Sequence, residues 1–326
     1  MTEIYKNIYK IPVSLPGSPL KELNAFLIKG EGDGRSLLVD TGFSAEESKQ
    51  SLFKGLNELS VDVNNMDVFL THLHTDHSGL IDVMKNENNS IFMSKEDSNV
   101  ILSELNDDHW VYVENQSLRI GFPPGKELKY KDHPGYVHRA KRAVESVYLE
   151  EGDEISYGGY NFTVLDLKGH TPGQLGLYEK EHGLLFSGDH ILNKITPNIC
   201  AWDFENDYLG YFLKNLKRVG ELKINVLFSA HRALVEDPYK RIAELQEHHA
   251  KRLGYARQIL ADKPSTAYEC SCLIKWDYLG GYFPDFPVPQ KWFASSEMLA
   301  HLQMLYFNGE VNRDLSDDGF FVYSLK

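Results

Sequence analysis

The sequence predicts an α+β fold in which two β-sheets pack together and helices cover the outer faces of the sheets. Short strand-like runs alternate with helical stretches in the first half of the 326-residue chain, and hairpin patterns occupy residues 146–189. A further helix, a strand and a long amphipathic helix follow, up to residue 262. Because each sheet and each amphipathic helix has an apolar face, two sheets packed together under helices bury them all. Hydrophobic residues form 42% of the chain, which is enough for such a core.

The expected strands are short apolar and β-branched runs bounded by turn-forming residues. In the first half of the chain they cover residues 8–13, 25–30, 36–42, 67–72 and 90–94. Hairpins are expected at 153–167, with a turn at Gly158 and Gly159, and at 175–189, and a buried strand covers 225–231. The expected helices cover residues 45–59, 79–88, 207–220 and 238–262.

The prediction divides the chain into a main domain, residues 1–262, and a small C-terminal domain, residues 263–326. The C-terminal part shows a helix (267–276), a Pro-rich loop, a second helix (295–309) and a two-stranded ribbon, which is the order of elements in a winged-helix module. Within the main domain, residues 95–146 form a long polar and aromatic insertion between expected core strands. Insertions of this size are usually lids or binding segments, so we expect a lid.

Charge and composition restrict the class of partner and the compartment. The net charge of −13 disfavours nucleic acid and anionic membranes as partners. No run of about 18 apolar residues and no signal-peptide pattern occurs, so neither a membrane span nor secretion is expected. The three cysteines fit no disulfide framework. We therefore predict a cytoplasmic protein, and we keep a homodimer as an open alternative to a monomer.

Three histidines and one aspartate occur within residues 72–77, in the stretch THLHTDH. Imidazole and carboxylate are the ligands that zinc and similar metals prefer. His72 and His74 stand two residues apart at a strand end, where alternate side chains point the same way, so they are expected to share one metal ion. Asp76 and His77 begin the next turn and are expected to reach a neighbouring ion. A polar loop that is rich in histidine by chance is the simpler alternative, but so dense a pattern is rare.

Further candidate ligands lie where other expected strands end. They are His170, Asp189 and His231. A single histidine of this kind is more often a hydrogen-bonded residue of the surface or core than a ligand. Three such positions in a chain that also holds the dense cluster favour a common metal site.

With these residues the sequence resembles the metallo-β-lactamase superfamily over about residues 20–235. The HxHxDH motif of that superfamily is matched by residues 72–77, and its other motif residues are matched by Asp40, His170, Asp189 and His231. The resemblance implies a four-layer αββα sandwich. It also implies two metal ions, the first held by His72, His74 and His170, the second by Asp76, His77 and His231, with Asp189 bridging them. Asp40 is expected to position a ligand or to cap the turn that follows it.

Two metal ions can lower the pKa of a shared water, so that a bridging hydroxide attacks a carbonyl or phosphoryl centre. The first hypothesis is a binuclear metal-dependent hydrolase of acyl, ester or thioester substrates, similar to glyoxalase II, in which Asp76 and Asp40 assist catalysis. The expected cofactors are two divalent ions, zinc before iron or manganese. Redox members of the superfamily, such as flavodiiron enzymes, are disfavoured because no flavodoxin-like segment is present.

Two other functions remain as alternatives. One is a phosphodiesterase or single-stranded RNA endonuclease of the same superfamily, and the other is a non-catalytic metal-binding module. A structural zinc site is closed by four ligands, whereas the residues found here leave positions open, which disfavours the module. The second helix of the C-terminal domain lacks Lys and Arg, so we expect that domain to pack, dimerise or cover the cleft rather than to bind phosphates.

The candidate substrate contacts are Arg139, His190 and Asn198. Arg139 belongs to a basic run from Lys126 to Arg142 that would bind the anionic group of a small-molecule acyl substrate, although such runs are more often solvated helix faces. His190 and Asn198 follow Asp189 closely and are expected to contact the substrate or to hold the loop. The neighbouring histidines 248 and 249 are expected to pack or to face solvent.

Overall fold

The computed structural model describes residues 1–326 except residues 124, 126–128, 277, 279 and 280. Within the described residues, the first sheet has the order β1-β2-β3-β4-β5-β6-β7 and the second has the order β12-β11-β10-β9-β8. The strands of the first sheet are β1 (Thr2–Tyr5), β2 (Ile8–Ser14), β3 (Glu22–Ile28), β4 (Ser36–Val39), β5 (Met66–Phe69), β6 (Ile91–Met93) and β7 (Val147–Tyr148). The strands of the second are β8 (Glu154–Tyr157), β9 (Tyr160–Asp166), β10 (Leu175–Glu179), β11 (Leu184–Gly188) and β12 (Val226–Ser229).

The helices cover the outer faces of the sheets and build the C-terminal part. They are α1 (Glu46–Glu58), α2 (Thr75–Ser78), α3 (Ile81–Met84), α4 (Lys95–Ser103), α5 (Asp107–Ile120), α6 (Pro134–His138), α7 (Tyr208–Val219), α8 (Pro238–Asp262), α9 (Ala267–Leu273) and α10 (Val288–Phe307). Short 3₁₀ turns lie at η1 (Val63–Asn65), η2 (Tyr130–Asp132) and η4 (Phe283–Asp285), and β13 (Val311–Leu315) pairs with β14 (Phe321–Leu325).

The fold is the four-layer αββα sandwich that the sequence predicts, because three apolar layers separate four layers of elements. An aromatic layer lies between the two sheets and includes Phe26, Phe186 and Phe228. A second layer joins the first sheet to α1 through Leu52 and Leu56. The third layer joins the second sheet to α7 and α8 and continues into α10, so the C-terminal elements share a core with the sandwich.

Phe186 lies at the centre of the layer between the sheets. Its ring stacks on Phe228 with centroids 4.3 Å apart and meets Phe26 and Phe162 edge-on at 5.5 and 5.8 Å. Substitution Phe186→Ala is expected to lower the free energy of unfolding by about 3–5 kcal/mol, because it leaves a cavity in a closed layer. Urea unfolding measures this loss. Tyr148→Ala, at an exposed position of β7, is the control and should change stability by less than about 0.5 kcal/mol. A loss below about 1 kcal/mol at Phe186 would contradict this description of the core.

Most predicted elements are present, but two boundaries are wrong. The helix predicted at 79–88 is instead α2 followed by α3, which ends at Met84. The Asn89 side chain accepts a hydrogen bond from the Asn86 N–H and donates one to the Met84 carbonyl, and such bonds compete with helix continuation. The helix predicted at 295–309 begins earlier, at Val288. Its first turn includes a proline, which needs no N–H there, so the Pro-rich stretch starts the helix rather than preceding it.

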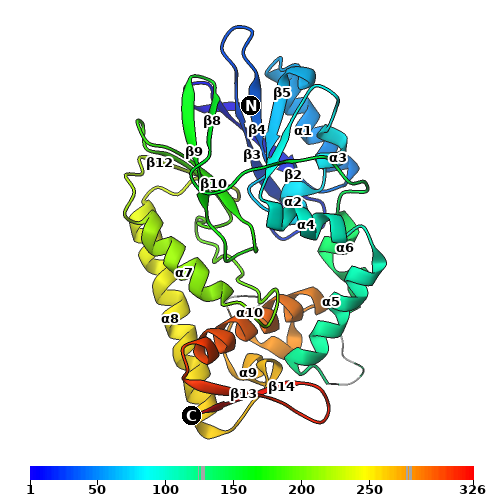
Figure 1. Ribbon diagram of the computed structural model, residues 1–326, viewed down its shortest axis with the longest axis vertical. Coiled ribbons are helices and arrows are strands. Elements are labelled where there is room, and N and C mark those ends of the chain that lie inside the picture. The colour runs from blue at the N-terminus through cyan, green and yellow to red at the C-terminus, as the bar shows by residue number, and fades with distance from the viewer. Residues whose placement is uncertain (124, 126–128, 277, 279–280) are drawn as a thin grey trace.

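The C-terminal elements follow the predicted order of helix, loop, helix and ribbon, and the comparison with a winged-helix module stays a prediction. Helix α8 runs from the sandwich to these elements, and α10 lies between α8 and α5 (Figure 1). The insertion contains α4, α5 and α6, which the sequence did not indicate. In the described part of the chain, no helix combines the length and apolar character needed to cross a membrane.

Candidate metal centre

The candidate ligands follow strands that end at one edge of the sandwich. In the first sheet β4 and β5 are parallel, so Asp40 and the loop of residues 71–77 leave the sheet on the same side. In the second sheet β9 and β11 are each antiparallel to β10, and β12 is parallel to β11. The chain therefore leaves β9, β11 and β12 in one direction too. The residues that follow these three strands are His170, Asp189 and His231.

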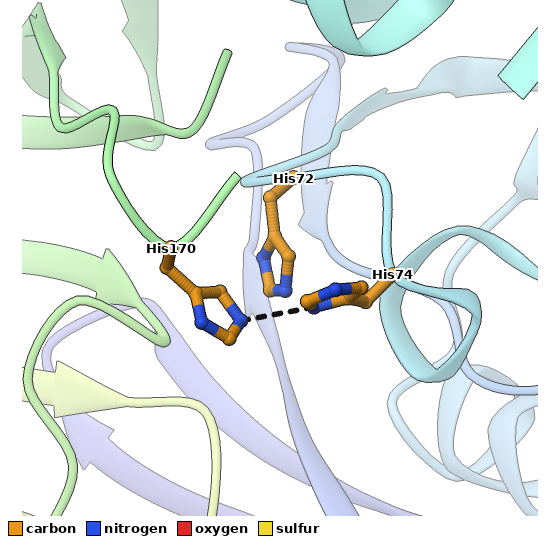
Figure 2. Close-up of side chains that lie close together, drawn as sticks. All are labelled: His72, His74 and His170. Carbon is orange, nitrogen blue, oxygen red and sulfur yellow. Dashed lines mark hydrogen bonds between the residues drawn. The ribbon is translucent and has the colours of Figure 1, made fainter. Parts of the chain in front are cut away.

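The first group of ligands consists of His72, His74 and His170, whose candidate ligand atoms lie within 4.8 Å of one another. Figure 2 shows the three imidazoles converging, two from one loop and His170 from another. The Nδ1 atom of His74 lies 2.9 Å from Nε2 of His170. Two ring nitrogens at this distance from separate loops would suit a cation placed between the three rings.

The second group consists of Asp76, His77 and His231. The Nε2 atom of His231 lies 3.2 Å from the Oδ2 atom of Asp76, and the Nε2 atom of His77 lies 3.8 Å from the same oxygen. His77 and His231 are completely buried, and their rings meet edge-on. The helical turn of α2 places Asp76 and His77 on this side, while His72 and His74 of the preceding loop serve the first group.

Asp189 stands between the two groups. Its Oδ1 atom lies 3.5 Å from Nε2 of His77 and 3.6 Å from Nε2 of His231. Its Oδ2 atom lies 3.7 Å from Nε2 of His170. One carboxylate thus presents one oxygen to each group, which would suit a ligand shared by two cations.

The hydrogen bonds of the rings fit divalent cations at both groups. Among the described residues, the Nε2 atoms of His72, His77 and His231 and the Oδ1 atom of Asp189 are buried without a hydrogen-bond partner. The opposite nitrogens are engaged: Nδ1 of His77 donates to Asp40 (2.8 Å), and Nδ1 of His231 donates to a backbone carbonyl (3.1 Å). Histidines that bind metals show this pattern, because the partner of one nitrogen fixes the tautomer and leaves the other free to coordinate. Unpartnered buried polar atoms are otherwise rare.

The electrostatics of the pocket also suit a cation. Burial lowers the pKa of His72 and of His74 well below the usual value, so these rings are neutral, as coordination requires. Burial disfavours the charged form of His77 as well, but the carboxylates of Asp40, Asp76 and Asp189 raise its pKa to about 10. Negative charge therefore surrounds the second group, and a bound cation would compensate it.

Asp40 supports this site through its neighbours. Its carboxylate accepts hydrogen bonds from the N–H and hydroxyl of Thr71, at 2.8 and 2.9 Å, in addition to the bond from His77. The same Thr71 oxygen lies 3.0 Å from Nδ1 of His72. Asp40 adopts a left-handed backbone conformation with φ of 64°, which is strained for a residue with a Cβ and is held by these contacts. It thus holds the loop of residues 71–77 near both of its ends without lying among the metal-facing atoms.

Asp97 is a buried residue of the site that sequence reasoning did not select. Its Oδ2 atom accepts hydrogen bonds from the Leu73 N–H (2.9 Å) and the Thr171 hydroxyl (2.8 Å), and its Oδ1 atom accepts one from the Gly173 N–H (2.7 Å). It therefore joins the loop of His72 and His74 to the loop of His170. Ser94 caps α4 by accepting a hydrogen bond from the Asp97 N–H, and no local sequence pattern connects Asp97 to Leu73, Thr171 or Gly173.

The predicted substrate contacts occupy three different environments. His190 is completely buried and its ring packs edge-on against Phe212. The side-chain amide of Asn198 donates to α10, and the backbone carbonyl of Asn198 accepts a hydrogen bond from His170. Arg139 stacks over the ring of Tyr136, 4.0 Å from its centroid. None of these contacts involves a substrate, so the substrate role of all three stays a prediction.

The insertion lies beside the second ligand group. Helix α6 packs against α2, and the carbonyl of His138 accepts a hydrogen bond from the Ser44 N–H. The ring of His138 stacks on Phe43 with centroids 4.0 Å apart. Lys126, where the predicted basic run begins, lies outside the described residues. The placement of α6 is compatible with a lid, and the lid stays a prediction.

A four-layer sandwich with two adjacent groups of histidine and aspartate at one edge defines a protein of αββα fold with a candidate metal centre. Residues 22–231 match the sequence model of the metallo-beta-lactamase superfamily, and the chain belongs to this superfamily. The solved structure of metallo-beta-lactamase family protein TTHA1429 from Thermus thermophilus is similar over 99% of this chain and 100% of that one, with 27% identity and a TM-score of 0.83.

Relatives with curated names point to hydrolysis. The protein named "Probable metallo-hydrolase YqjP" of Bacillus subtilis is 25% identical over 86% of this chain and 86% of its own length. Hydroxyacylglutathione hydrolase GloC of Haemophilus influenzae is 27% identical over 49% of this chain and 62% of its own length. Acyl-coenzyme A thioesterase MBLAC2 of Gallus gallus is 29% identical over 43% of this chain and 46% of its own length.

Proposed function

We propose that the chain is a binuclear metal-dependent hydrolase that cleaves acyl, ester or thioester substrates. The observation that carries the proposal is the position of Asp189, whose two oxygens face two separate groups of ligands. Two bound divalent cations, zinc in our proposal, would supply a water of lowered pKa and polarise the substrate carbonyl. The names of two relatives, a hydroxyacylglutathione hydrolase and an acyl-coenzyme A thioesterase, support this class of substrate.

The residues of the chain would have distinct duties in this reaction. His72, His74 and His170 would hold the first cation, Asp76, His77 and His231 the second, and Asp189 both. The Oδ2 atom of Asp76 faces His77 and His231, so its other carboxylate oxygen could orient the attacking water. Asp40 would keep the His77 ring in the tautomer that coordinates through Nε2.

Cleavage of single-stranded RNA is the competing function, and the C-terminal part gives it little support. The side chain of Arg313 in this part is occupied within the molecule: it stacks on Tyr306, with the guanidinium 4.4 Å from the ring centroid, and donates to the Phe204 carbonyl. Backbone phosphates of RNA are normally bound by free Lys and Arg side chains. We therefore propose thioesters as the substrate class in preference to single-stranded RNA.

The test is a panel of acyl thioesters and esters assayed beside single-stranded RNA, with wild-type protein and the His74→Ala variant. Wild-type protein should carry close to two metal ions per chain by elemental analysis and should hydrolyse a thioester. His74→Ala should lower kcat/KM by about 10³-fold or more, because the first cation loses a ligand and with it several kcal/mol of transition-state stabilisation. Activity that survives the substitution, or one metal ion or none in the wild type, would contradict the proposal.

The control variant is His182→Ala. His182 lies in the turn before β11, at the opposite end of that strand from Asp189, and pairs with Glu179. It should keep both metal ions and the wild-type rate. RNA cleavage that depends on His74, without thioester hydrolysis, would decide for the nuclease.

A further inference from the structure

Helix α10 of the C-terminal part places a buried carboxylate, Glu297, close to the metal centre. The side chain is only 9% exposed. Its Oε1 atom lies 3.0 Å from the guanidinium Nη1 of Arg252 on α8. Its Oε2 atom accepts a hydrogen bond of 2.9 Å from the side-chain amide of Asn198. One oxygen of Glu297 thus contacts α8, and the other binds the loop between β11 and α7.

Asn198 connects this carboxylate to a ligand of the first group. The amide of Asn198 also donates to the Phe293 carbonyl of α10 at 3.2 Å, so α10 binds the Asn198 side chain twice. The Asn198 carbonyl accepts a hydrogen bond of 2.8 Å from Nδ1 of His170. With its proton held on Nδ1, His170 presents Nε2 to His74 and Asp189. The orientation of this ligand therefore depends on where α10 holds Asn198.

The surroundings of Glu297 contain three histidines, His248, His249 and His301, and a third cation there is the obvious alternative. His248, His249 and Glu297 have candidate ligand atoms within 4.8 Å of one another, and within the described part of the chain Nε2 of His248 and Nε2 of His249 are buried without a hydrogen-bond partner. The guanidinium of Arg252, however, already lies against the same carboxylate. Burial opposes ionisation of Glu297, yet Arg252 and His248 hold its pKa at about 2, so its charge is already compensated within the protein. A cation would have to displace or oppose the guanidinium.

We propose that Glu297 is a positioning residue for the first metal site, acting through Asn198 on His170. The inference rests on the proposed two-metal function. It makes α10, which lies outside the matched residues 22–231, a necessary part of the metal centre. Partners that orient a coordinating histidine typically contribute about 10–100-fold to metal affinity. Loss of Glu297 should therefore weaken the first site by about this factor and leave the second site nearly unchanged.

The test compares Glu297→Ala, Glu297→Gln and Asn198→Ala with a matched control, Glu310→Ala. Glu310 also joins α8 to the C-terminal part, through two contacts with Arg257 at 2.6 and 2.9 Å. Among the described contacts it has none with Asn198. Each variant is titrated with zinc against a chelator of known affinity, and the ring nitrogens of metal-free protein labelled with ¹⁵N-histidine are examined by NMR.

The expected results separate positioning from general stability. Glu297→Ala and Asn198→Ala should weaken one zinc site by about 10–100-fold, and metal-free His170 should populate both tautomers. Glu297→Gln should keep near wild-type zinc affinity with its oxygen turned to Asn198, but it should lower stability because its NH₂ group then faces the guanidinium of Arg252. Glu310→Ala should lower the melting temperature while both zinc affinities and the His170 tautomer stay unchanged. If Glu297→Ala fails to fold, Asn198→Ala and Glu297→Gln still decide.

Several outcomes would overturn the inference. They are unchanged zinc affinity in Asn198→Ala, an equal loss in Glu310→Ala, or a third zinc ion that disappears in Glu297→Gln. A change in KM for substrate in Asn198→Ala with unaltered zinc binding would also overturn it and would assign Asn198 to the substrate instead. Wild-type protein that binds fewer than two zinc ions would defeat the proposed function itself, which is a different failure.

Discussion

Substitution Asp189→Ala is expected to abolish hydrolysis and to leave at most one metal ion per chain. Asp189 is the residue with an oxygen toward each ligand group, so its removal takes a ligand and a negative charge from both. The rate should fall by about 10³-fold or more in kcat/KM, since the two-cation arrangement supplies several kcal/mol of transition-state stabilisation. Elemental analysis gives the metal content, and steady-state kinetics on the thioester found in the panel give the rate.

A second variant and a control sharpen this result. Asp189→Asn keeps the size of the side chain and one oxygen, so it should retain more metal than the alanine variant but remain far below wild type in rate. Asp166→Ala is the control, because Asp166 also lies at a strand end but turns to Lys168, with which it pairs at 3.1 Å. It should keep both metal ions. Two tightly bound ions in Asp189→Ala would show that the carboxylate does not bridge the groups.

The candidate ligands of this centre could be selected from the sequence because each one lies in a local pattern, and their role as ligands stays a prediction. The stretch of residues 72–77 is dense in imidazole, and the other candidates follow apolar runs that predict strands. Strand ends that run in one direction meet at one edge of a sheet, so proximity follows from the strand order. The bounds of α8 were equally predictable. Asp237 caps its start, Pro238 follows the cap, and Pro264 lies just beyond its end.

The residues that hold the ligands in place could not be predicted in this way. Asp97 reaches Thr171 across 74 positions of sequence, and Glu297 reaches Asn198 across 99. Neither belongs to a pattern that names its partner, since only the packing of α4 and α10 against the sandwich brings these atoms together. Adjacency in sequence also does not fix the direction in which a side chain points. His190 follows Asp189 directly, yet it turns into the core against Phe212. Two helices of the insertion also contact elements that lie far from them in sequence or belong to another segment, α5 with α10 and α6 with α2.

Substitution Asp97→Ala is expected to cause the largest combined loss of stability and metal binding of any residue outside the ligand groups. It leaves the N–H groups of Leu73 and Gly173 and the Thr171 hydroxyl without their acceptor in a fully buried place. Removing the acceptor of several buried donors costs about 3–5 kcal/mol. The free energy of unfolding should fall by this amount in metal-free protein, as measured by urea unfolding. Zinc affinity should fall too, because the loops of His74 and His170 lose their common anchor.

The variant Asp97→Asn distinguishes the contribution of the hydrogen bonds to stability from the contribution of side-chain volume. The two backbone N–H groups bind different oxygens of Asp97, so an amide must present its NH₂ group to one of them whichever way it is turned. We expect a loss of about 1–3 kcal/mol, between wild type and Asp97→Ala. Glu96→Ala is the matched control, since Glu96 lies in the same first turn of α4 but is exposed, and it should stay within about 0.5 kcal/mol.

The charge of Asp97 works against its hydrogen bonds, and the asparagine variant measures which effect is larger. Burial raises the pKa of Asp97 to about 7, so the neutral amide is relieved of a cost that the carboxylate carries. We predict a loss because the cost of leaving one backbone N–H group without an acceptor exceeds the cost of burying the carboxylate charge. If Asp97→Asn were as stable as wild type, burial of the charge would cost as much as the hydrogen bonds contribute, and the anchoring role of Asp97 would lie in its shape rather than in its charge.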